Sequence, residues 1–403
     1  MAVGLKAPGK LHPVHGVRLS AVHSGIKQDS EVKDLALIEI QAGSSVAAVF
    51  TQSHFCAAPV SLCRKHLAQT PGSRFLLINS GNANAATGDA GLETARVCCQ
   101  SVADAAGVCA EEVLPFSTGV IAEQLQPEPV LQAVPGLVRD LDANGWLAAA
   151  EAIMTTDTLP KAVSVQLYVN DRPITITGIA KGSGMIKPNM ATMLTYITTD
   201  AGIPQQQLDG LLERLVAGSF NSITVDGDTS TNDSCVLVAT GASGVDIDAG
   251  DSDFHAALRQ VFEELAQAII RDAEGATKFV EICVEGADSE ADARSVAFTI
   301  AESPLVKTAL FASDPNWGRF IMAIGRSPLT RIDIDRIDLY LGAVRLLHQG
   351  LPDPEYSESL GQSEMSREEI SIRVNLNLGD ASTRIWTSDL SYEYVKINAE
   401  YRS

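Results

Sequence analysis

A threonine hydroxyl at an unusual junction is the group whose chemistry the sequence suggests first. Thr192 follows a segment rich in Gly, Pro and Asn (184–189), which breaks strands, and precedes residues 193–200, which alternate like a buried strand. A hydroxyl is a weak nucleophile until a base removes its proton. The α-amine of the same residue, with a reference pKa of about 7.7 to 8.0, can be that base if the chain is first cut before Thr192.

The chain itself can make that cut. If the loop places the Thr192 hydroxyl against the carbonyl of Ala191, attack gives an ester by an N-to-O shift, and water then hydrolyses the ester. The small Ala191 side chain leaves room for the attack, and the β-branched Thr192 has restricted χ1 freedom. An ordinary loop-to-strand junction is the alternative, because residue types alone do not distinguish the two.

Other common kinds of active site are not indicated. The seven histidines form no pair at i,i+4 on a helix and adjoin no Cys or carboxylate cluster, so no metal site is predicted. Residues 225–234 resemble a calcium loop. However, Thr231 stands where such a loop requires Gly, and Leu237 stands where it requires a bidentate Glu. This segment is therefore interpreted as a polar turn near a site. Residues 78–88 are rich in Gly and Asn and fit either close backbone approach or a turn whose amides satisfy buried backbone.

The elements that must position Thr192 are strands and helices in grouped runs rather than in strict alternation. Strands are predicted over 34–41, 45–52, 74–80, 162–169, 173–183, 193–200 and 234–241. Helices are predicted over 91–107, 143–156, 205–220 and 253–275. Such grouping favours layered α and β structure over a doubly wound sheet.

The pattern of predicted strands and helices changes near residue 285. A domain boundary is therefore predicted between residues 1–285 and 286–403. Shorter strands are predicted beyond it, over 296–300, 333–341, 370–377, 382–388 and 391–397. The stretch 351–369, rich in Pro, Ser and Glu, is interpreted as a long exposed connection.

Composition narrows the class of protein. The 403 residues carry a formal charge of -20 and no basic stripe, which argues against nucleic acid or an anionic membrane as a partner. No apolar run is long enough for a membrane span, and the N-terminus lacks the features of a secretory signal. Seven cysteines without CxxC spacing are typical of reduced, buried thiols, so a cytoplasmic protein is expected.

The segment GSGMIKPNMATML (182–194) resembles the self-cleavage segment of the ornithine acetyltransferase family, the bifunctional glutamate N-acetyltransferases of the cyclic arginine pathway. Further segments fit the same family in the same order. They are INSGNANAATG (78–88), FSTGVI (116–121), EAIMTTDTLPK (151–161), VDGDTSTNDS (225–234), SPLVKTALFASDPNWGR (303–319) and NAEYRS (398–403). The chain resembles this family from one end to the other.

The resemblance implies roles for individual residues. Thr192 would be the nucleophile, freed by cleavage between Ala191 and Thr192, and Thr118 and Gly119 would form the oxyanion hole. The residues implied to line the substrate pocket are Thr158, Lys181, Thr192, Glu274, Asn398 and Ser403. Residue type alone instead favours solvated surface charges for the two charged members and a frayed tail for Asn398 and Ser403, so only the resemblance assigns these four residues to the site.

The resemblance also implies a fold, a reaction and an assembly. The fold would be an αββα sandwich of the self-processing N-terminal-nucleophile-like type, plus a smaller C-terminal α/β domain. The reaction would be ping-pong transfer of an acetyl group from N2-acetylornithine to glutamate through acetyl-Thr192. No cofactor is implied, although acetyl-coenzyme A is a candidate second donor. The fragments 1–191 and 192–403 would stay together in a heterotetramer of two α and two β chains.

Two rival functions remain open. A related self-processing amidase or aminopeptidase would transfer the acyl group to water, and such enzymes usually expose Ser rather than Thr after cleavage. A non-catalytic binding protein would keep the scaffold and remain a single uncut chain. Denaturing mass measurement separates the second rival, and capture of the acetyl group by glutamate separates the first.

Overall fold

The computed structural model describes residues 2–69, 72–187, 193–248 and 250–401, which form two compact units. The sandwich unit comprises Lys6–Asn221 and Asp228–Ile269, and the C-terminal unit comprises Met1–Leu5, Ser222–Gly227 and Ile270–Ser403. The division predicted near residue 285 falls instead inside a strand of the C-terminal unit, β11 (Phe279–Ala287).

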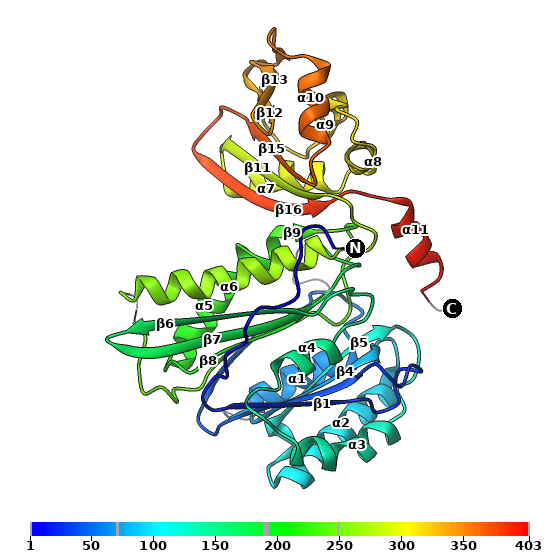
Figure 1. The fold of residues 1–403 in the computed structure, drawn as a ribbon, viewed down its shortest axis with the longest axis vertical. Coiled ribbons are helices and arrows are strands. Elements are labelled where there is room, and N and C mark those ends of the chain that lie inside the picture. Colours follow the sequence, from blue (N-terminus) through cyan, green and yellow to red (C-terminus); the bar gives the residue numbers. More distant parts are fainter. Residues whose placement is uncertain (1, 70–71, 188–192, 249, 402–403) are drawn as a thin grey trace. The chain divides into compact units, whose positions relative to one another are not determined.

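Two stacked sheets form the centre of the sandwich unit (Figure 1). The first has the order β1 (Val17–Val22), β2 (Leu35–Ile40), β4 (Phe75–Asn82) and β5 (Val113–Val120). The second has the order β3 (Ser45–Phe50), β10 (Ser234–Ala239), β8 (Leu194–Thr199), β7 (Arg172–Lys181) and β6 (Lys161–Val169). Only the pairs β4–β5 and β10–β8 among these neighbours are parallel.

The two sheets are held together by a shared apolar core. Ile38 and Ile78 of the first sheet are fully buried in the same cluster as Ile179 and Val236 of the second. Alternation along each strand explains this, since every second side chain faces the other sheet. Full burial of one such side chain stabilises the fold by about 1.5–3 kcal/mol.

Helices cover the outer faces of both sheets. They are α2 (Gly88–Ala106), α3 (Glu128–Arg139), α5 (Gln205–Ala217) and α6 (Ser252–Arg271). Two further helices lie elsewhere: α1 (Ala58–Gln69) packs against β5, and α4 (Trp146–Ala152) joins the core between the sheets, in contact with β1 and β7. Val102 of α2 and Val134 of α3 pack with Leu77 on the outer face of the first sheet. On the second sheet, Leu265 of α6 approaches the backbone of Gly178, and α5 contacts β3 and β10. These layers confirm the predicted αββα sandwich.

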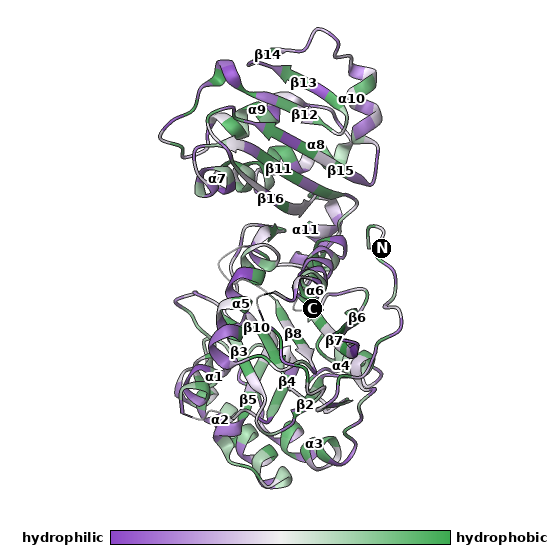
Figure 2. Cartoon of the chain, turned by 90° about the vertical axis from the view of Figure 1, so that its left-hand side faces the viewer, coloured by the Kyte–Doolittle hydropathy of each residue, from purple (hydrophilic) through white to green (hydrophobic). Residues whose placement is uncertain are grey.

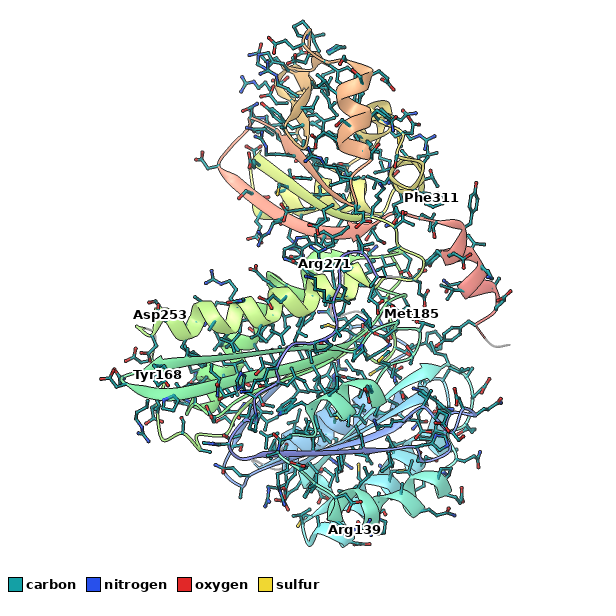
Figure 3. All side chains as sticks on the ribbon, viewed as in Figure 1. Arg139, Tyr168, Met185, Asp253, Arg271 and Phe311 are labelled. Atoms are coloured by element: carbon teal, nitrogen blue, oxygen red, sulfur yellow. The ribbon has the colours of Figure 1, made fainter. Side chains whose placement is uncertain are left out.

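The tip and the base of the long β6–β7 hairpin mark opposite ends of the sandwich unit. Tyr168, at the hairpin tip, is 74% exposed and points away from the sheets (Figure 3). Met185 lies beyond the opposite end of β7 (Figure 3). Lys181, the last residue of β7, is therefore at the end of the sheet where the loop leading to residue 192 begins.

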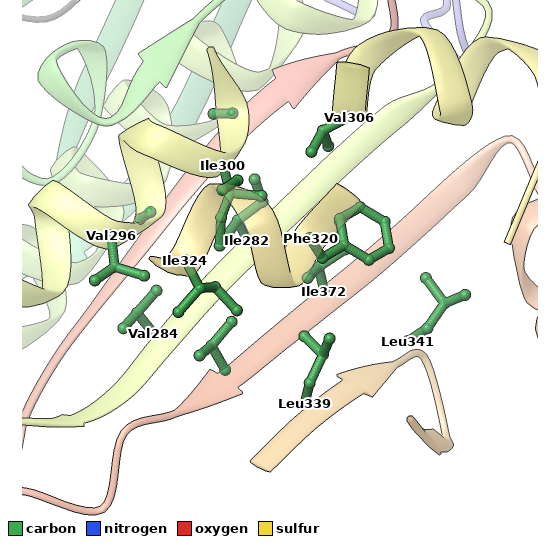
Figure 4. Packing of buried hydrophobic residues seen from close by; sticks show 14 of the residues in the cluster. Ile282, Val284, Val296, Ile300, Val306, Phe320, Ile324, Leu339, Leu341 and Ile372 are labelled. Carbon is green, nitrogen blue, oxygen red and sulfur yellow. The ribbon is translucent and has the colours of Figure 1, made fainter. Parts of the chain in front are cut away.

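The C-terminal unit is a mixed sheet with helices, which confirms the predicted second α/β domain. The sheet order is β14 (Leu351–Pro352), β13 (Val344–His348), β12 (Asp338–Leu341), β15 (Glu369–Asn375), β11, β16 (Ala381–Ser388) and β9 (Ile223–Thr224). The helices are α7 (Glu290–Ala301), α8 (Pro304–Ala312), α9 (Trp317–Gly325), α10 (Glu358–Met365) and α11 (Tyr392–Ala399). Ile282 and Ile372 of the sheet pack with Ile300 and Phe320 of the helices (Figure 4).

Two strand predictions in this unit were wrong, because capping outweighs β-branched composition there. Residues 296–300 lie in α7, which begins where the Ser289 hydroxyl accepts the N–H of Asp292. Residues 391–397 fall largely in α11, which begins where Ser391 accepts the N–H of Tyr394. The connection predicted over 351–369 instead contains β14 and α10, and Met365 of α10 is buried.

The hydropathy of the elements follows these layers. Figure 2 shows hydrophobic colouring along β4, β8 and β10, as expected for strands enclosed between other layers. Of the helices that the structure describes, none combines the length and apolar character required to cross a membrane. All seven cysteines are unpaired; Cys109 is exposed, and burial raises the pKa of Cys98 to about 12.

Candidate active site

Three predicted site residues, Ala191, Thr192 and Ser403, lie outside the described residues. The strand that follows Thr192 is described, and all of its residues, Leu194–Thr199, are buried. Leu194 pairs with Ser234 of β10 on one side and with Lys181 of β7 on the other. The start of β8 is thus held on both sides by neighbouring strands.

Lys181 is buried and links the two sheets. Lys181 is only 5% exposed, so its ammonium group is not the solvated surface charge that residue type alone suggested. The ammonium Nζ donates to Thr155 Oγ1 at 2.8 Å and to Thr118 Oγ1 at 3.4 Å. The structure therefore brings together Lys181 and Thr118, two residues that the family resemblance assigns to one site.

Gly119 occupies a position that requires glycine. Its φ is +135°, and a Cβ built on it would lie 2.2 Å from the backbone carbon of Gly81. The pairing register of β4 and β5 shifts at Gly81 and Asn82, so a bulge lies beside Thr118 and Gly119. Bulges redirect backbone and side-chain groups, which suits a turn that must present hydrogen-bond donors to a substrate.

Asp157 anchors the lysines at this end of the sheet. Its Oδ1 lies 2.6 Å from Lys161 Nζ and accepts the N–H of Gly182 at 2.8 Å, and its Oδ2 lies 4.0 Å from Lys181 Nζ. Burial disfavours the charged carboxylate, but Lys161, Lys181 and the Gly182 amide outweigh burial and hold the pKa of Asp157 well below its usual range. Asp157 is therefore charged in the folded protein.

The cluster contains three lysines and three buried carboxyls. Lys27 belongs to it electrostatically, since burial and the charge of Lys181 lower its pKa while Asp34 and Asp157 oppose them. Lys27 Nζ donates to the carbonyl of Met154 at 2.7 Å. Lys27, Lys161 and Lys181 face the carboxyls of Asp34, Asp157 and Asp233, and burial raises the pKa of Asp233 well above its usual range, which disfavours its negative charge. Since the charge of one carboxyl is disfavoured, the lysines favour binding of an anion.

The remaining predicted pocket residues lie in two places. Thr158 follows Asp157 in the sandwich unit and is exposed. In the C-terminal unit, Glu274 is buried, which excludes a surface role, and its Oε2 accepts Asn398 Nδ2 at 2.7 Å. Asn398 lies in α11, so it is not part of a frayed tail.

The tail helix α11 is fastened at its beginning. The Ser391 hydroxyl donates to the carbonyl of Gly275 at 2.6 Å. Gly275 has a φ of +67°, and a Cβ there would lie 2.5 Å from the Tyr394 nitrogen. Only glycine allows this approach, so the residue after Glu274 fixes the helix that carries Asn398.

Two polar segments noted in the sequence support the site. In 78–88, Asn84 N–H donates to Asn82 Oδ1 and Asn84 Nδ2 donates to the carbonyl of Gly91, so the amides satisfy their own turn. In 225–234, Asn232 Nδ2 donates to the carbonyl of Ser117 at 2.9 Å, directly before Thr118. The second segment is therefore a polar turn packed against the predicted oxyanion strand.

Sequence reasoning missed Asp157, whose carboxylate lies 4.0 Å from Lys181 Nζ, and Lys161, which pairs with the same carboxylate. Both lie in 151–161, a segment that was matched to the family, but residue types along it do not reveal that it meets the end of β7. Within the described part of the chain, no three His, Cys, Asp or Glu side chains gather as metal ligands would.

Comparison with known proteins identifies the family. The model of the ArgJ family matches residues 18–403. The arginine biosynthesis bifunctional protein ArgJ of Methylococcus capsulatus is 52% identical over 398 residues, which cover 98% of this chain and 97% of the relative. The protein of the same name from Pseudomonas fluorescens is 49% identical over 408 residues and is matched over 100% of both chains.

Two solved structures of similar proteins each match about half of the chain. ArgJ of Bacillus halodurans is 40% identical with a TM-score of 0.49, covering 51% of this chain and 98% of that chain. Ornithine acetyltransferase of Mycobacterium tuberculosis, complexed with ornithine, is 36% identical with a TM-score of 0.39, covering 44% and 92%. The family match over almost the whole length confirms the resemblance found in the sequence: the chain belongs to the ArgJ family.

Proposed function

We propose that the chain is an acetyltransferase of arginine biosynthesis that moves the acetyl group of N2-acetylornithine to glutamate. Its membership of the ArgJ family supports this assignment, as do relatives named arginine biosynthesis bifunctional proteins at 52% and 49% identity. The single observation on which the site rests is the partly buried hydrogen bond from Lys181 to Thr118, beside the start of β8.

The nucleophile of the proposal is Thr192, freed by self-cleavage between Ala191 and Thr192. Its new α-amine removes the proton of its own hydroxyl, which then attacks the acetyl carbonyl. β8 supports this role, because a strand paired on both sides holds the chain directly after Thr192.

Thr118 and Gly119 stabilise the oxyanion in the proposal. Lys181 Nζ can only donate hydrogen bonds, so the Thr118 hydroxyl accepts from it and keeps its own proton for another acceptor. That proton and the Gly119 N–H would face the developing negative charge. Removal of one such donor typically costs about 2.7–4 kcal/mol of transition-state stabilisation.

The substrate offers one anion and one cation to the pocket. As the resemblance to the family implies, Lys181 would bind the α-carboxylate of N2-acetylornithine and Glu274 would bind its terminal ammonium. Thr158, Asn398 and Ser403 complete the proposed pocket. Ornithine leaves as the acetyl-Thr192 ester forms, and the amine of glutamate then takes the acetyl group.

Two further elements belong to the proposal. Acetyl-coenzyme A serves as a second acetyl donor, which the word bifunctional in the relatives' name supports. The two fragments assemble as a heterotetramer of two α and two β chains, without a resident cofactor.

Two measurements test the function. Denaturing mass spectrometry is expected to give two fragments, the second beginning at Thr192. Incubation with N2-acetylornithine carrying a labelled acetyl group is expected to yield labelled N-acetylglutamate only when glutamate is present. Free labelled acetate at a rate independent of glutamate would favour a hydrolase, and a single uncut chain without transfer would favour a binding protein.

A further inference from the structure

Lys27 is a half-buried cation beside the proposed oxyanion turn, and none of the steps above uses it. The loop that carries it is fixed by Asp34, a fully buried residue directly before β2. The Asp34 carboxylate accepts the N–H groups of Ser24 at 2.6 Å, Gly25 at 3.1 Å and Lys27 at 2.9 Å. Because hydrogen bonds to a charged acceptor are strong, this loop holds the backbone of Lys27 in one place.

The side chain of Lys27 packs against the bulge that contains Gly119. A Cβ built on Gly81 would lie 3.0 Å from Lys27 Cγ, so the stem of the lysine lies directly on the backbone of Gly81. Gly81 pairs with Gly119 across β4 and β5, and a Cβ on Gly119 would lie 2.2 Å from the Gly81 carbon. Lys27 is therefore a close neighbour of the turn that is proposed to stabilise the oxyanion.

Lys27 and Lys181 bind consecutive residues of one segment. Lys27 Nζ donates to the carbonyl of Met154 at 2.7 Å, and Lys181 Nζ donates to the hydroxyl of Thr155 at 2.8 Å and to that of Thr118 at 3.4 Å. Burial lowers the pKa of Lys27, and the nearby charge of Lys181 lowers it further. Two cations thus lie close together at the end of the sandwich unit where the substrate pocket is proposed.

The ammonium of Lys27 has no carboxylate of its own. Within the described ranges it makes no ion pair, and its only acceptors are the carbonyls of Met154 and, at 3.3 Å, of Lys33. An ammonium has three N–H donors, so one is left over. Asp34 is engaged with the loop backbone, and Asp157 with a second lysine and a backbone N–H. Because a partly desolvated charge is stabilised by an opposite charge, Lys27 suits an anionic group of a bound molecule.

The two substrates of the proposed reaction differ at the end of the side chain. N2-acetylornithine and glutamate share an α-carboxylate, but the first ends in an ammonium and the second in a carboxylate. Glu274, which is proposed for the ammonium, would repel the side-chain carboxylate of glutamate. Lys181 is proposed for the α-carboxylate that both substrates share. Binding of glutamate therefore needs a further cation, and Lys27 is a cation near Lys181 with a donor left over.

We propose that Lys27 determines the choice of acceptor, in that its ammonium binds the side-chain carboxylate of glutamate. The inference rests on the proposed function, because glutamate is a substrate only there. No covalent bond to Lys27 forms or breaks; the residue binds and orients the molecule whose amine takes the acetyl group. An acceptor without this carboxylate leaves the ammonium unpaired and is therefore disfavoured.

The test is Lys27→Met in the full chain, which removes the charge and keeps most of the side-chain volume. Transfer from N2-acetylornithine gives kcat/KM for glutamate, which is expected to fall on the order of tenfold or more, as for loss of a hydrogen bond to a charged group. Exchange of labelled ornithine into N2-acetylornithine, measured without glutamate, needs no side-chain carboxylate. This exchange is expected to stay near the wild-type rate, which a merely structural role would not predict.

Glutamine is a second probe, because it differs from glutamate only by an amide in place of the side-chain carboxylate. The wild-type protein is expected to prefer glutamate as the acceptor. In Lys27→Met this preference, measured as the ratio of the two kcat/KM values, is expected to fall on the order of tenfold or more. The charge that distinguishes the two acceptors is absent from the variant.

Lys33→Met is the matched control. Lys33 belongs to the same loop, and its Nζ donates to Glu151 Oε2 at 2.7 Å. The control removes a lysine charge from the loop but leaves the Lys33 carbonyl, which accepts from Lys27, in place. It is expected to leave the exchange, the transfer and the preference for glutamate over glutamine unchanged.

The remaining outcomes decide against the inference. Equal losses of exchange and transfer in a folded Lys27→Met protein would assign Lys27 to a step that both reactions share. Unchanged transfer to glutamate overturns the inference, and so does a wild-type protein that accepts glutamine as readily as glutamate. If thermal unfolding shows that Lys27→Met does not fold, Lys27→Gln replaces it with the same expectations. Collapse of both variants beside a folded Lys33→Met assigns a structural role. Failure of the proposed function is separate, since the wild-type protein would then transfer no acetyl group to glutamate.

Discussion

Lys181 Nζ lies 3.4 Å from Thr118 Oγ1 and thereby connects the last residue of β7 in one sheet with β5 in the other. Residues that are distant in sequence meet here because the two sheets stack with β5 and β8 in contact. The rings of Phe116 and Tyr196 mark that contact, with centroids 5.1 Å apart and an edge-on arrangement. The sheet-to-sheet core therefore sets the geometry of the candidate site.

Thr118→Ala is expected to slow acyl transfer with little effect on folding. The variant loses the hydroxyl that would face the oxyanion, which corresponds to roughly 10²–10³ in kcat. Thr118 is only partly buried, so the thermal midpoint should change little. Thr118→Ser keeps the hydroxyl and serves as the control. Near-normal turnover by the alanine variant would remove Thr118 from the oxyanion hole.

Gly119→Ala is expected to destabilise the sandwich unit by about 2 kcal/mol or more, because steric overlap and a strained backbone add together. The new Cβ would lie 2.2 Å from the carbon of Gly81, in backbone that cannot move aside like a side chain. Urea unfolding measures the loss. Gly218→Ala, where a Cβ meets nothing within 4 Å, is the control and should be nearly neutral. Equal stability of the two variants would contradict the close approach of β4 and β5.

Asp157→Asn is expected to lower the free energy of unfolding by about 3–5 kcal/mol at pH 7, because it leaves Lys161 buried without its counter-charge. Urea unfolding of the wild type and variant gives the difference. The double variant Asp157→Asn/Lys161→Met contains no unpaired buried charge at position 161, so it should recover part of the lost free energy of unfolding. A single variant as stable as the wild type would show that the pair is not needed.

Asp157 also gives the wild type resistance to acid. Its folded pKa is depressed, so its contribution to stability is fully present above the unfolded pKa of about 3.9 and is lost as the pH falls through the lower folded pKa. The difference in unfolding free energy between wild type and Asp157→Asn should therefore stay constant from pH 7 to about pH 5. A difference that disappears within this range would contradict a depressed pKa.

Glu274→Gln is expected to weaken binding of N2-acetylornithine while leaving the fold intact. The amide oxygen can still accept Asn398 Nδ2, so the thermal midpoint should be retained, but the negative charge that would meet the terminal ammonium is lost. KM for N2-acetylornithine should rise on the order of tenfold or more. Glu281→Gln, in β11 of the same unit, is a control for loss of a carboxylate elsewhere. An unchanged KM in Glu274→Gln would exclude the proposed cation site.

Local patterns predicted most of the sandwich strands because those strands are long and apolar. β5 was not predicted from pattern, since Pro115 and Gly119 interrupt it, and it appeared only as a family motif. The strands predicted at 296–300 and 391–397 were wrong because a serine cap decides the conformation at each helix start, whatever β-branched residues follow.

The candidate site was predicted in part for a different reason. Thr118, Gly119 and Lys181 came from resemblance to a family, not from residue spacing. Asp157 and Asp233 have no sequence signal of their own, because each acquires its character from contacts across strands: Gly182 and Lys161 for the first, Met193 for the second. The balance between burial and these contacts, which lowers the pKa of Asp157 and raises that of Asp233, is a property of the fold.

The strand order of the second sheet has a consequence for the assembly of a cut chain. β8 and β10 follow residue 192 in sequence, yet they lie between β3 and β7, which precede it. In a protein cut before residue 192, the sheet would alternate between two polypeptides, and neither could complete it alone. Refolding of the separated fragments would then be a second-order process whose rate rises with protein concentration, whereas the uncut precursor would fold at a rate independent of it. After cleavage, the sheet could therefore re-form only when the two fragments meet, although the uncut chain folds on its own.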